Sequence, residues 1–171
     1  VHQSFGNCPK YIHVRQLVRV PRQTGSVETF GAELPEDAMR LIAACETMFV
    51  ASASGDAAQA QARGLDISHR GGEAGFLRLD GKVITVPDYP GNRYFNTLGN
   101  LLLEPRAALV MVDLDSGDIL QLQGIADIAW QAELPDARAE RAWRFTVTRG
   151  WLRRAAFPMR QVHQDHAGVA S

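Results

Sequence analysis

The sequence predicts a mainly β protein with a few helices, in which antiparallel strands close into a barrel. Short apolar segments follow one another along most of the chain, and turn residues such as Gly, Pro, Asn and Asp separate them. Helical patterns are too few to cover both faces of a parallel sheet. An antiparallel barrel accounts for both observations, because it joins successive strands without crossover helices.

The first half of the chain is expected to form one helix and four strands. Pro35 and the two acids behind it open a helix, whose apolar residues recur at helical spacing as far as residue 45. An apolar strand covers residues 47–53, and another ends within 66–72 at a pair of glycines. Residues 76–86 form a hairpin around an Asp-Gly turn.

The second half is expected to begin with a helix over residues 94–103, which ends at a proline. Two strands follow at 107–114 and 119–130, joined by a turn of Asp, Ser and Gly. A short charged helix over 133–141 and a last strand over 143–148 complete the series. Most of the core is therefore expected to come from strands.

Composition and charge are those of one globular domain. The 171 residues are 46% hydrophobic and 22% charged, with a formal net charge of −1. A balanced charge offers no basic face to nucleic acid or anionic membranes. No apolar run is long enough to span a bilayer and no leader pattern is present, so a cytoplasmic location is expected. Cys8 and Cys45 match no metal or redox spacing, and no metal site is expected.

The first of two candidate site segments is Asp66-Ile67-Ser68-His69-Arg70, which ends a strand before two glycines. Ser68 and Arg70 share one face of that strand and can line a pocket wall. His69 points to the opposite face, where it either stacks near a bound ring or caps a neighbouring strand. Asp66 either takes part in the site or pairs with Arg70 or Arg63 across the sheet.

The second candidate segment leaves a strand through Val86-Pro87 and turns at Pro90-Gly91. A helix is then expected to start with Asn92 as its cap. Unpaired N–H groups at a helix start, together with a guanidinium, an amide and a hydroxyl, attract a phosphate dianion. The side chains that supply these groups are Arg93, Asn96 and Thr97.

At these segments the chain resembles the flavin-binding split-barrel proteins related to pyridoxamine 5'-phosphate oxidase. The shared pattern is Asp-x-Ser-His-Arg-Gly at 66–71, Gly-Phe at 75–76, Pro-Asp-x-x-Gly-Asn at 87–92 and Pro-Arg at 105–106. The resemblance covers residues 35–160 approximately. It implies an antiparallel split β-barrel that holds flavin mononucleotide (FMN) non-covalently against the first segment, with the phosphate at the helix start.

The resemblance also implies an activity. The chain would be an FMN-dependent oxidoreductase that exchanges hydride or electrons with a small-molecule donor and acceptor. The alternative is a non-catalytic module that binds a flavin or another cofactor, or a docking half for a reductase domain. No catalytic residue is identified, and His69 is the one candidate acid–base group. Gln121 either donates its amide to the flavin's pyrimidine edge or is an ordinary solvent-facing strand residue.

One position departs from the family pattern. The oxidase itself uses an Arg-Lys pair on the helix to bind phosphate, and Asn96 and Thr97 stand there in this chain. The phosphate charge would then rest on Arg70 and Arg93. Oxidase activity on pyridoxamine 5'-phosphate is for this reason not expected.

The opening of the chain resembles the junction between the halves of double-length family members. Residues 1–29 would then be a junction segment from a missing first half, 30–160 the split-barrel domain and 161–171 a flexible tail. In the junction, Cys8, Lys10 and Tyr11 are expected to close the pocket. A homodimer is also expected, since the family's cofactor usually lies at an interface between two barrels.

Overall fold

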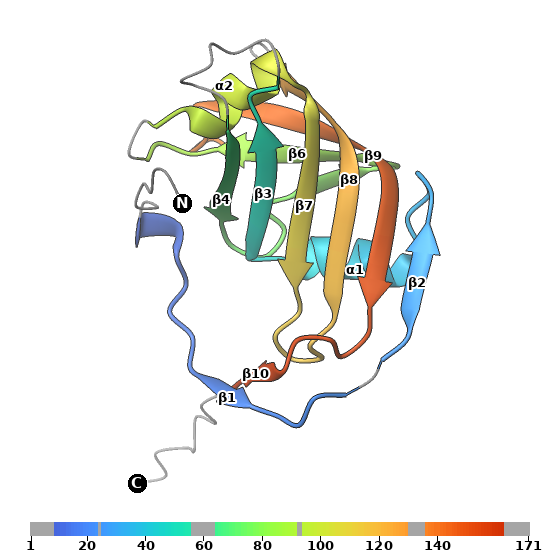
Figure 1. Cartoon of the computed structure of the whole chain (residues 1–171). Helices are drawn as coiled ribbons and strands as arrows, with labels where there is room; N and C mark the ends of the chain where they lie inside the picture. Colours follow the sequence, from blue (N-terminus) through green and yellow to red (C-terminus); the bar gives the residue numbers. More distant parts are fainter. Residues whose placement is uncertain (1–8, 24, 56–63, 92–93, 130–135, 163–171) are drawn as a thin grey trace, which may run out of the picture.

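The computed structural model describes residues 9–23, 25–55, 64–91, 94–129 and 136–162. Its main sheet is antiparallel and contains β2 (Val27–Phe30), β3 (Thr47–Ala53), β4 (Leu65–Gly71), β5 (Arg78–Asp80), β6 (Val83–Asp88), β7 (Arg106–Val112), β8 (Ile119–Ala129) and β9 (Arg141–Arg153). The strand order is β4-β3-β7-β8-β9-β6-β5, and β2 is added to β9. Figure 1 shows this sheet from its broad side.

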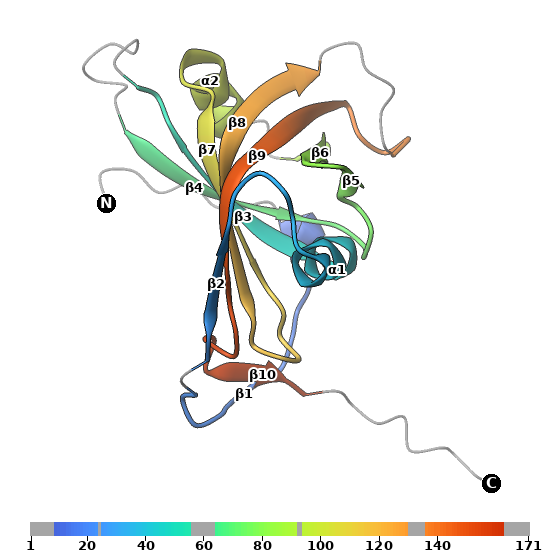
Figure 2. The same cartoon turned by 90° about the vertical axis from the view of Figure 1, so that its right-hand side faces the viewer.

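The sheet bends into a barrel because β9 belongs to both of its halves. The first half of β9 pairs with β6, and its last residues pair with β2, while β8 runs along nearly its whole length. A register shift in β8 at Gln123/Gly124 lies near the middle of this bend. Figure 2 shows β9 curving from β2 and β8 towards β6.

The barrel is open, which corrects the expectation of a closed one and agrees with the split barrel that the resemblance implies. The strand path ends at β4 on one side and at the β5–β6 hairpin on the other, and no pairing joins these ends. The side chains of Asp66, Ser68 and Arg70 on β4 are polar and half-buried. Polar groups of this kind need water or a ligand beside them rather than a packed apolar strand. We call this open side of the barrel the split.

Two helices, α1 (Glu36–Ala44) and α2 (Asn96–Leu103), lie against the sheet, and a two-stranded sheet of β1 (Leu17–Arg19) and β10 (Met159–Gln161) stands apart from it. The helix α1 buries Ala38 and Ile42. A single 3-10 turn, η1 (Pro9–Tyr11), opens the described chain. The strand β2 covers the expected boundary between the junction segment and the barrel, which lies between residues 29 and 30. The last residues of the expected junction segment therefore belong to the main sheet. No described helix has the length and apolar character needed to span a bilayer.

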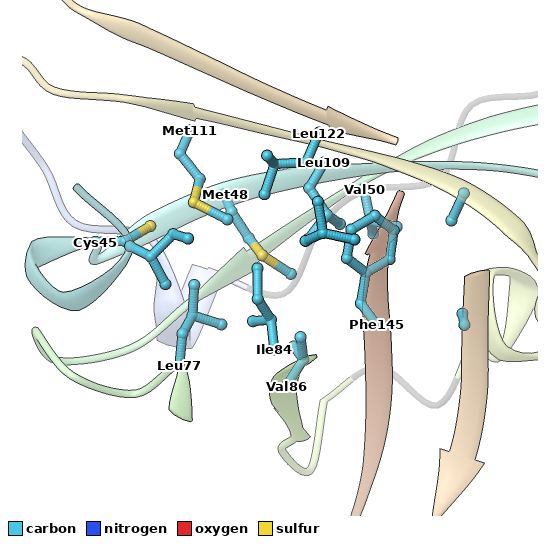
Figure 3. Packing of buried hydrophobic residues seen from close by; sticks show 14 of the residues in the cluster. Cys45, Met48, Val50, Leu77, Ile84, Val86, Leu109, Met111, Leu122 and Phe145 are labelled. Carbon is cyan, nitrogen blue, oxygen red and sulfur yellow. The ribbon is translucent and has the colours of Figure 1, made fainter. Parts of the chain in front are cut away.

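The core fills the inside of the bent sheet. Alternate residues of β3 and β7 are buried, as the period of a strand with one covered face requires. Each large apolar side chain that is fully buried contributes about 1.5–3 kcal/mol. Figure 3 shows the inward side chains that meet there, which include Met48, Val50, Leu77, Ile84, Val86, Leu109, Met111, Leu122 and Phe145.

Several element predictions are confirmed. The helix after Pro35, the strand at 47–53 and the Asp-Gly hairpin all form where the pattern placed them, and Cys45 is buried in the core. The strands at 107–114 and 119–130 are present with ends shifted by one or two residues.

Two helix predictions are wrong, one in where the helix starts and one in whether a helix forms. The helix α2 begins at Asn96 with Phe95 as its N-cap, so Asn92 is not the cap. The ring of Phe95 packs under the guanidinium of Arg141 at 4.9 Å, which fits a residue held outside the helix. Where a charged helix was predicted over 133–141, residues 136–140 form a turn in which Asp136 accepts the backbone N–H of Arg138, and Arg141 begins β9.

Candidate functional site

Arg70 is the centre of the candidate site. It shares one face of β4 with Ser68 and Asp66, opposite to His69. Its Nη1 donates to Ser68 Oγ at 2.8 Å and to the carbonyl oxygen of His69 at 3.0 Å. Its Nε is buried and, within the described part of the chain, has no hydrogen-bond partner. The half-buried Arg70 therefore has a buried Nε–H donor that no described protein group satisfies.

The start of α2 lies next to the same strand. Thr97 Oγ1 donates to Asp66 Oδ2 at 3.3 Å, and Asn100 Nδ2 donates to Ser52 Oγ at 3.1 Å. These two contacts fasten α2 to β4 and β3. Phe95, at the N-cap, makes no side-chain capping bond, so it supplies no acceptor to the first N–H groups of the helix.

Asp88 and Arg141 add a pair of opposite charges. Asp88 ends β6, and its Oδ2 lies 3.5 Å from Arg141 Nε on β9, while Arg141 also bonds Glu140 at 2.9 Å. Burial raises the pKa of Asp88, although Arg70 and Arg141 oppose that shift. Burial lowers the pKa of Arg70, against the attraction of Asp88 and Asp66. The candidate site therefore contains partly desolvated charges of both signs.

Residues 9–15, which we call the strap, run past the ends of β4 and β6. The ring of Tyr11 stacks on Tyr89 with centroids 5.2 Å apart, and its hydroxyl donates to the carbonyl oxygen of Pro90 at 2.9 Å. The carbonyl oxygen of Tyr11 packs against Gly71, where a side chain would overlap it. The strap thus touches both sequence segments that predicted the site.

One end of the strap is held by Arg15, and Lys10 packs on the neighbouring ring within the strap. Arg15 forms an ion pair with Glu46 and donates to Thr47 Oγ1 at 3.4 Å. Lys10 Nζ lies 5.3 Å from the ring centroid of Tyr11. Cys8, the third residue expected to close the pocket, lies outside the described residues.

His69 lies on the outer face of the sheet. Its ring meets Phe49 edge to face, with centroids 5.8 Å apart. Burial, and after it the nearby cations Arg70 and Arg15, lower its pKa. The imidazole is for this reason held neutral near pH 7. Within one copy of the chain, His69 and Arg70 point to opposite sides of β4 and do not share a pocket.

Gln121 also lies on the outer face, near the start of β8. Arg153 Nε donates to its Oε1 at 2.7 Å. Gln121 and His69 belong to one row of paired positions that crosses six strands. The row runs through Thr29, Trp151, Gln121, Val110, Phe49 and His69.

Comparison with known proteins rests on structure. No model of a known protein family and no curated protein matches the sequence. A putative pyridoxamine 5'-phosphate oxidase of Lactobacillus delbrueckii is similar, with a TM-score of 0.52 and 13% identity over 70% of this chain and 93% of that one. HupZ of Group A Streptococcus is similar too, with a TM-score of 0.52 and 15% identity over 68% and 91%. The fold is that of the pyridoxamine 5'-phosphate oxidase-like split barrels.

In this split barrel the predicted site residues lie in different places. The polar side chains at the split are those already described on β4 and α2. Two more predicted residues, Val86 and Pro87, are buried in β6, whereas Gly91 and Asn96 are exposed. Ile67 is 72% exposed on the outer face. Asn92 and Arg93 lie outside the described residues.

Sequence reasoning missed Asp88, Tyr89 and Arg141. The first two stand inside the Pro-Asp-x-x-Gly-Asn segment. The signal that could have identified Asp88 is a carboxylate directly after the proline that ends an apolar strand. Arg141 carries no local signal, because only the pairing of β9 with β6 brings it to Asp88.

Proposed function

We propose that this split barrel binds FMN non-covalently, with the phosphate at Arg70 and the start of α2. The observation that carries the proposal is the buried guanidinium of Arg70, whose Nε has no hydrogen-bond partner in the described part of the chain. A phosphate oxygen is the strongest acceptor for such a donor. Ser68 Oγ accepts from Arg70 Nη1, and Thr97 Oγ1 donates to Asp66 on the same face of β4, so in the proposal both hydroxyls belong to the polar side of the pocket.

The remaining predicted residues take places around this end in the proposal. Asp66 offers a carboxylate to hydroxyl or imide donors of the ligand. Pro87 forms an apolar wall, and Val86, which faces the core, supports it from behind. Gly91 and Asn96 flank the phosphate in the proposal, and the roles expected of Asn92 and Arg93 there stay predictions. The strap, with Lys10 and Tyr11, closes the pocket beside Gly71 in the proposal, and the expected contribution of Cys8 stays a prediction.

Bound FMN supplies hydride and electron transfer, and the chain orients it and limits its exposure to water. We propose an oxidoreductase that exchanges electrons with a small-molecule donor and acceptor in the cytoplasm. The alternative, a flavin-binding module without turnover, is favoured by one observation. His69, the only predicted acid–base group, lies on the face of β4 opposite to Arg70.

A second copy of the chain belongs to this proposal. Leu65 and Ile67 on β4 are 88% and 72% exposed, and Phe49 beside them on β3 is 42% exposed. Contiguous apolar surface of this kind on a sheet is typical of a protein–protein interface. A symmetric pair formed through this face would enclose His69 and Gln121 between two barrels.

Release of the ligand tests the proposal. The purified protein should be yellow, with absorbance near ~450 nm, and denaturation should release a molecule with the mass of FMN. Anaerobic addition of NADH or NADPH then separates the two candidates, since bleaching of the bound flavin indicates an enzyme and an unchanged spectrum indicates a binding module. A protein that neither contains nor takes up FMN would refute both.

A further inference from the structure

We infer that Asp136 is a positioning residue for the candidate site, because it fixes the ring of Tyr89 on which the strap docks and so slows exchange of the bound ligand. Asp136 lies in the turn of residues 136–140, just before β9 and outside the two segments that predicted the site. The effect on the ligand rests on the proposed function. The docking of the strap, in contrast, is a property of the chain by itself.

The turn of residues 136–140 is fastened to the end of β6, which carries the first step. The backbone N–H of Glu140 donates to the carbonyl oxygen of Asp88 at 3.0 Å, and the register of β9 with β6 begins directly after it. Within the turn, the carboxylate of Asp136 accepts the backbone N–H of Arg138 at 2.8 Å and its Nη2 at 2.6 Å. Asp136 therefore has a fixed place beside the residue that follows β6.

That residue is Tyr89, and the turn holds its side chain at two points. The hydroxyl of Tyr89 donates to Asp136 Oδ2 at 2.8 Å, and the guanidinium of Arg138 lies over the ring, 5.6 Å from its centroid. Burial, and after it the bond to Asp136, raises the pKa of Tyr89 to about 12. Arg138 holds the pKa of Asp136 well below its usual range. At neutral pH a protonated phenol therefore donates to an ionised carboxylate, which is a charge-assisted bond.

The ring of Tyr89 is in turn the surface on which the strap docks. Tyr11 stacks on it with centroids 5.2 Å apart and an angle of 22° between the planes. Because the energy of such a pair depends on how the rings are offset and tilted, a change in the orientation of Tyr89 weakens it. The backbone of Tyr11 packs against Gly71 at the end of β4. Asp136 thus acts, through one ring, on how the strap lies beside the strand that carries the site.

The test uses four variants, which are Asp136→Ala, Tyr89→Phe, the double variant of these two, and Asp136→Asn. Trypsin cleavage after Lys10 and Arg15 is followed by mass spectrometry in the ligand-free protein, and FMN release is followed by stopped-flow fluorescence. Asp136→Ala and Tyr89→Phe each remove the same hydrogen bond. We expect each of them to speed both processes about three- to tenfold, and the double variant to be no faster than the faster single variant.

Two further proteins separate this bond from a general effect of lost charge. Asp136→Asn keeps an oxygen that accepts from the hydroxyl of Tyr89, so both of its rates should stay within about twofold of the native values. The matched control is Glu104→Ala at the C-cap of α2. Glu104 accepts from the backbone N–H of Arg106 at 3.1 Å and from its Nη2 at 2.7 Å, which is the same local pattern without a tyrosine donor. Both rates should be native in Glu104→Ala.

Native cleavage rates in Asp136→Ala and Tyr89→Phe would overturn the inference. Effects that add in the double variant would overturn it as well, because Asp136 would then not act through Tyr89. Faster cleavage with an unchanged rate of FMN release would refute the effect on the ligand. Urea denaturation checks that each variant is folded, and Tyr89→Phe, which keeps the ring, decides the matter if Asp136→Ala is not. If the native chain binds no FMN, the proposed function fails, and the cleavage rates alone decide whether Asp136 positions the strap.

Discussion

The carbonyl oxygen of Tyr11 packs against Gly71 at the end of the strand that carries Arg70. Any β-carbon at Gly71 would overlap this oxygen and would lie 2.9 Å from His69 Cε1. Glycine is therefore required for the strap to lie against β4. Since Tyr11 also contacts Tyr89 and Pro90, the strap can close over the site only while this close approach is kept.

Gly71→Ala should release the strap. The overlap is with backbone, which cannot move as a flexible side chain can, so we expect a loss of about 1–3 kcal/mol in the free energy of unfolding. Trypsin should also cut faster after Lys10 and Arg15. The matched control is Gly99→Ala in α2, where a β-carbon has no neighbour within 4 Å. This substitution should raise the free energy of unfolding by about 0.5–1 kcal/mol. Unaltered cleavage in Gly71→Ala would mean that the strap is not docked there.

Tyr11→Phe should speed the release of FMN. The variant keeps the ring stacked on Tyr89 but removes the hydroxyl that donates to Pro90. Loss of one such hydrogen bond costs about 0.5–1.5 kcal/mol, which corresponds to a dissociation rate about two- to tenfold higher. Stopped-flow flavin fluorescence measures this rate. Val14→Ala, at a fully exposed strap position, should leave it unchanged, and an equally unchanged rate in Tyr11→Phe would exclude the closing role.

Ile67→Lys should prevent association of two copies. A charge in the middle of the exposed apolar patch on β4 cannot be buried against a second barrel without a large desolvation penalty. Sedimentation velocity should show a dimer for the native chain and a monomer for Ile67→Lys. The control, Val18→Lys, changes an equally apolar exposed residue on the separate sheet of β1 and β10. A dimer that survives in Ile67→Lys would place the interface elsewhere.

His69→Gln should weaken the acid sensitivity of the fold. The pKa of His69 is lowered in the folded chain, so below its unfolded value of about 6.5 the unfolded state takes up a proton that the folded state resists. The free energy of unfolding of the native chain should therefore fall as the pH drops from 6.5 towards 5. In His69→Gln this fall should be smaller, as measured by urea denaturation at each pH. Parallel curves would show that His69 does not contribute.

Local patterns predicted the parts of the fold that depend on neighbours in sequence. The helix after Pro35 and the Asp-Gly hairpin follow from capping and turn chemistry, and they form as expected. Phe49 is as apolar as its buried neighbours on β3, yet it points outward and is 42% exposed. Its face of β3 is decided by the register with β4 and β7, which no local pattern contains.

The candidate site was predicted in part for the same reason. Alternation along one strand correctly separated Arg70 from His69, because the period of a strand is a local property. The relation of Asp88 to Arg141 depends on two strands more than fifty residues apart in sequence, and that of Tyr11 to Gly71 depends on how the strap crosses the sheet. Contacts of this kind follow from the fold alone.

The central claim is that Arg70 binds the phosphate of FMN, and Arg70→Gln tests it most directly. Because the guanidinium is buried without an ion pair in the described part of the chain, its loss should leave the protein folded, which urea denaturation checks. The dissociation constants of FMN and riboflavin are then measured for both proteins. We predict that the affinity for FMN falls about 10- to 100-fold, as expected for charge-assisted bonds worth about 1.5–3 kcal/mol, while that for riboflavin stays within about twofold. Equal losses for both ligands would contradict the account.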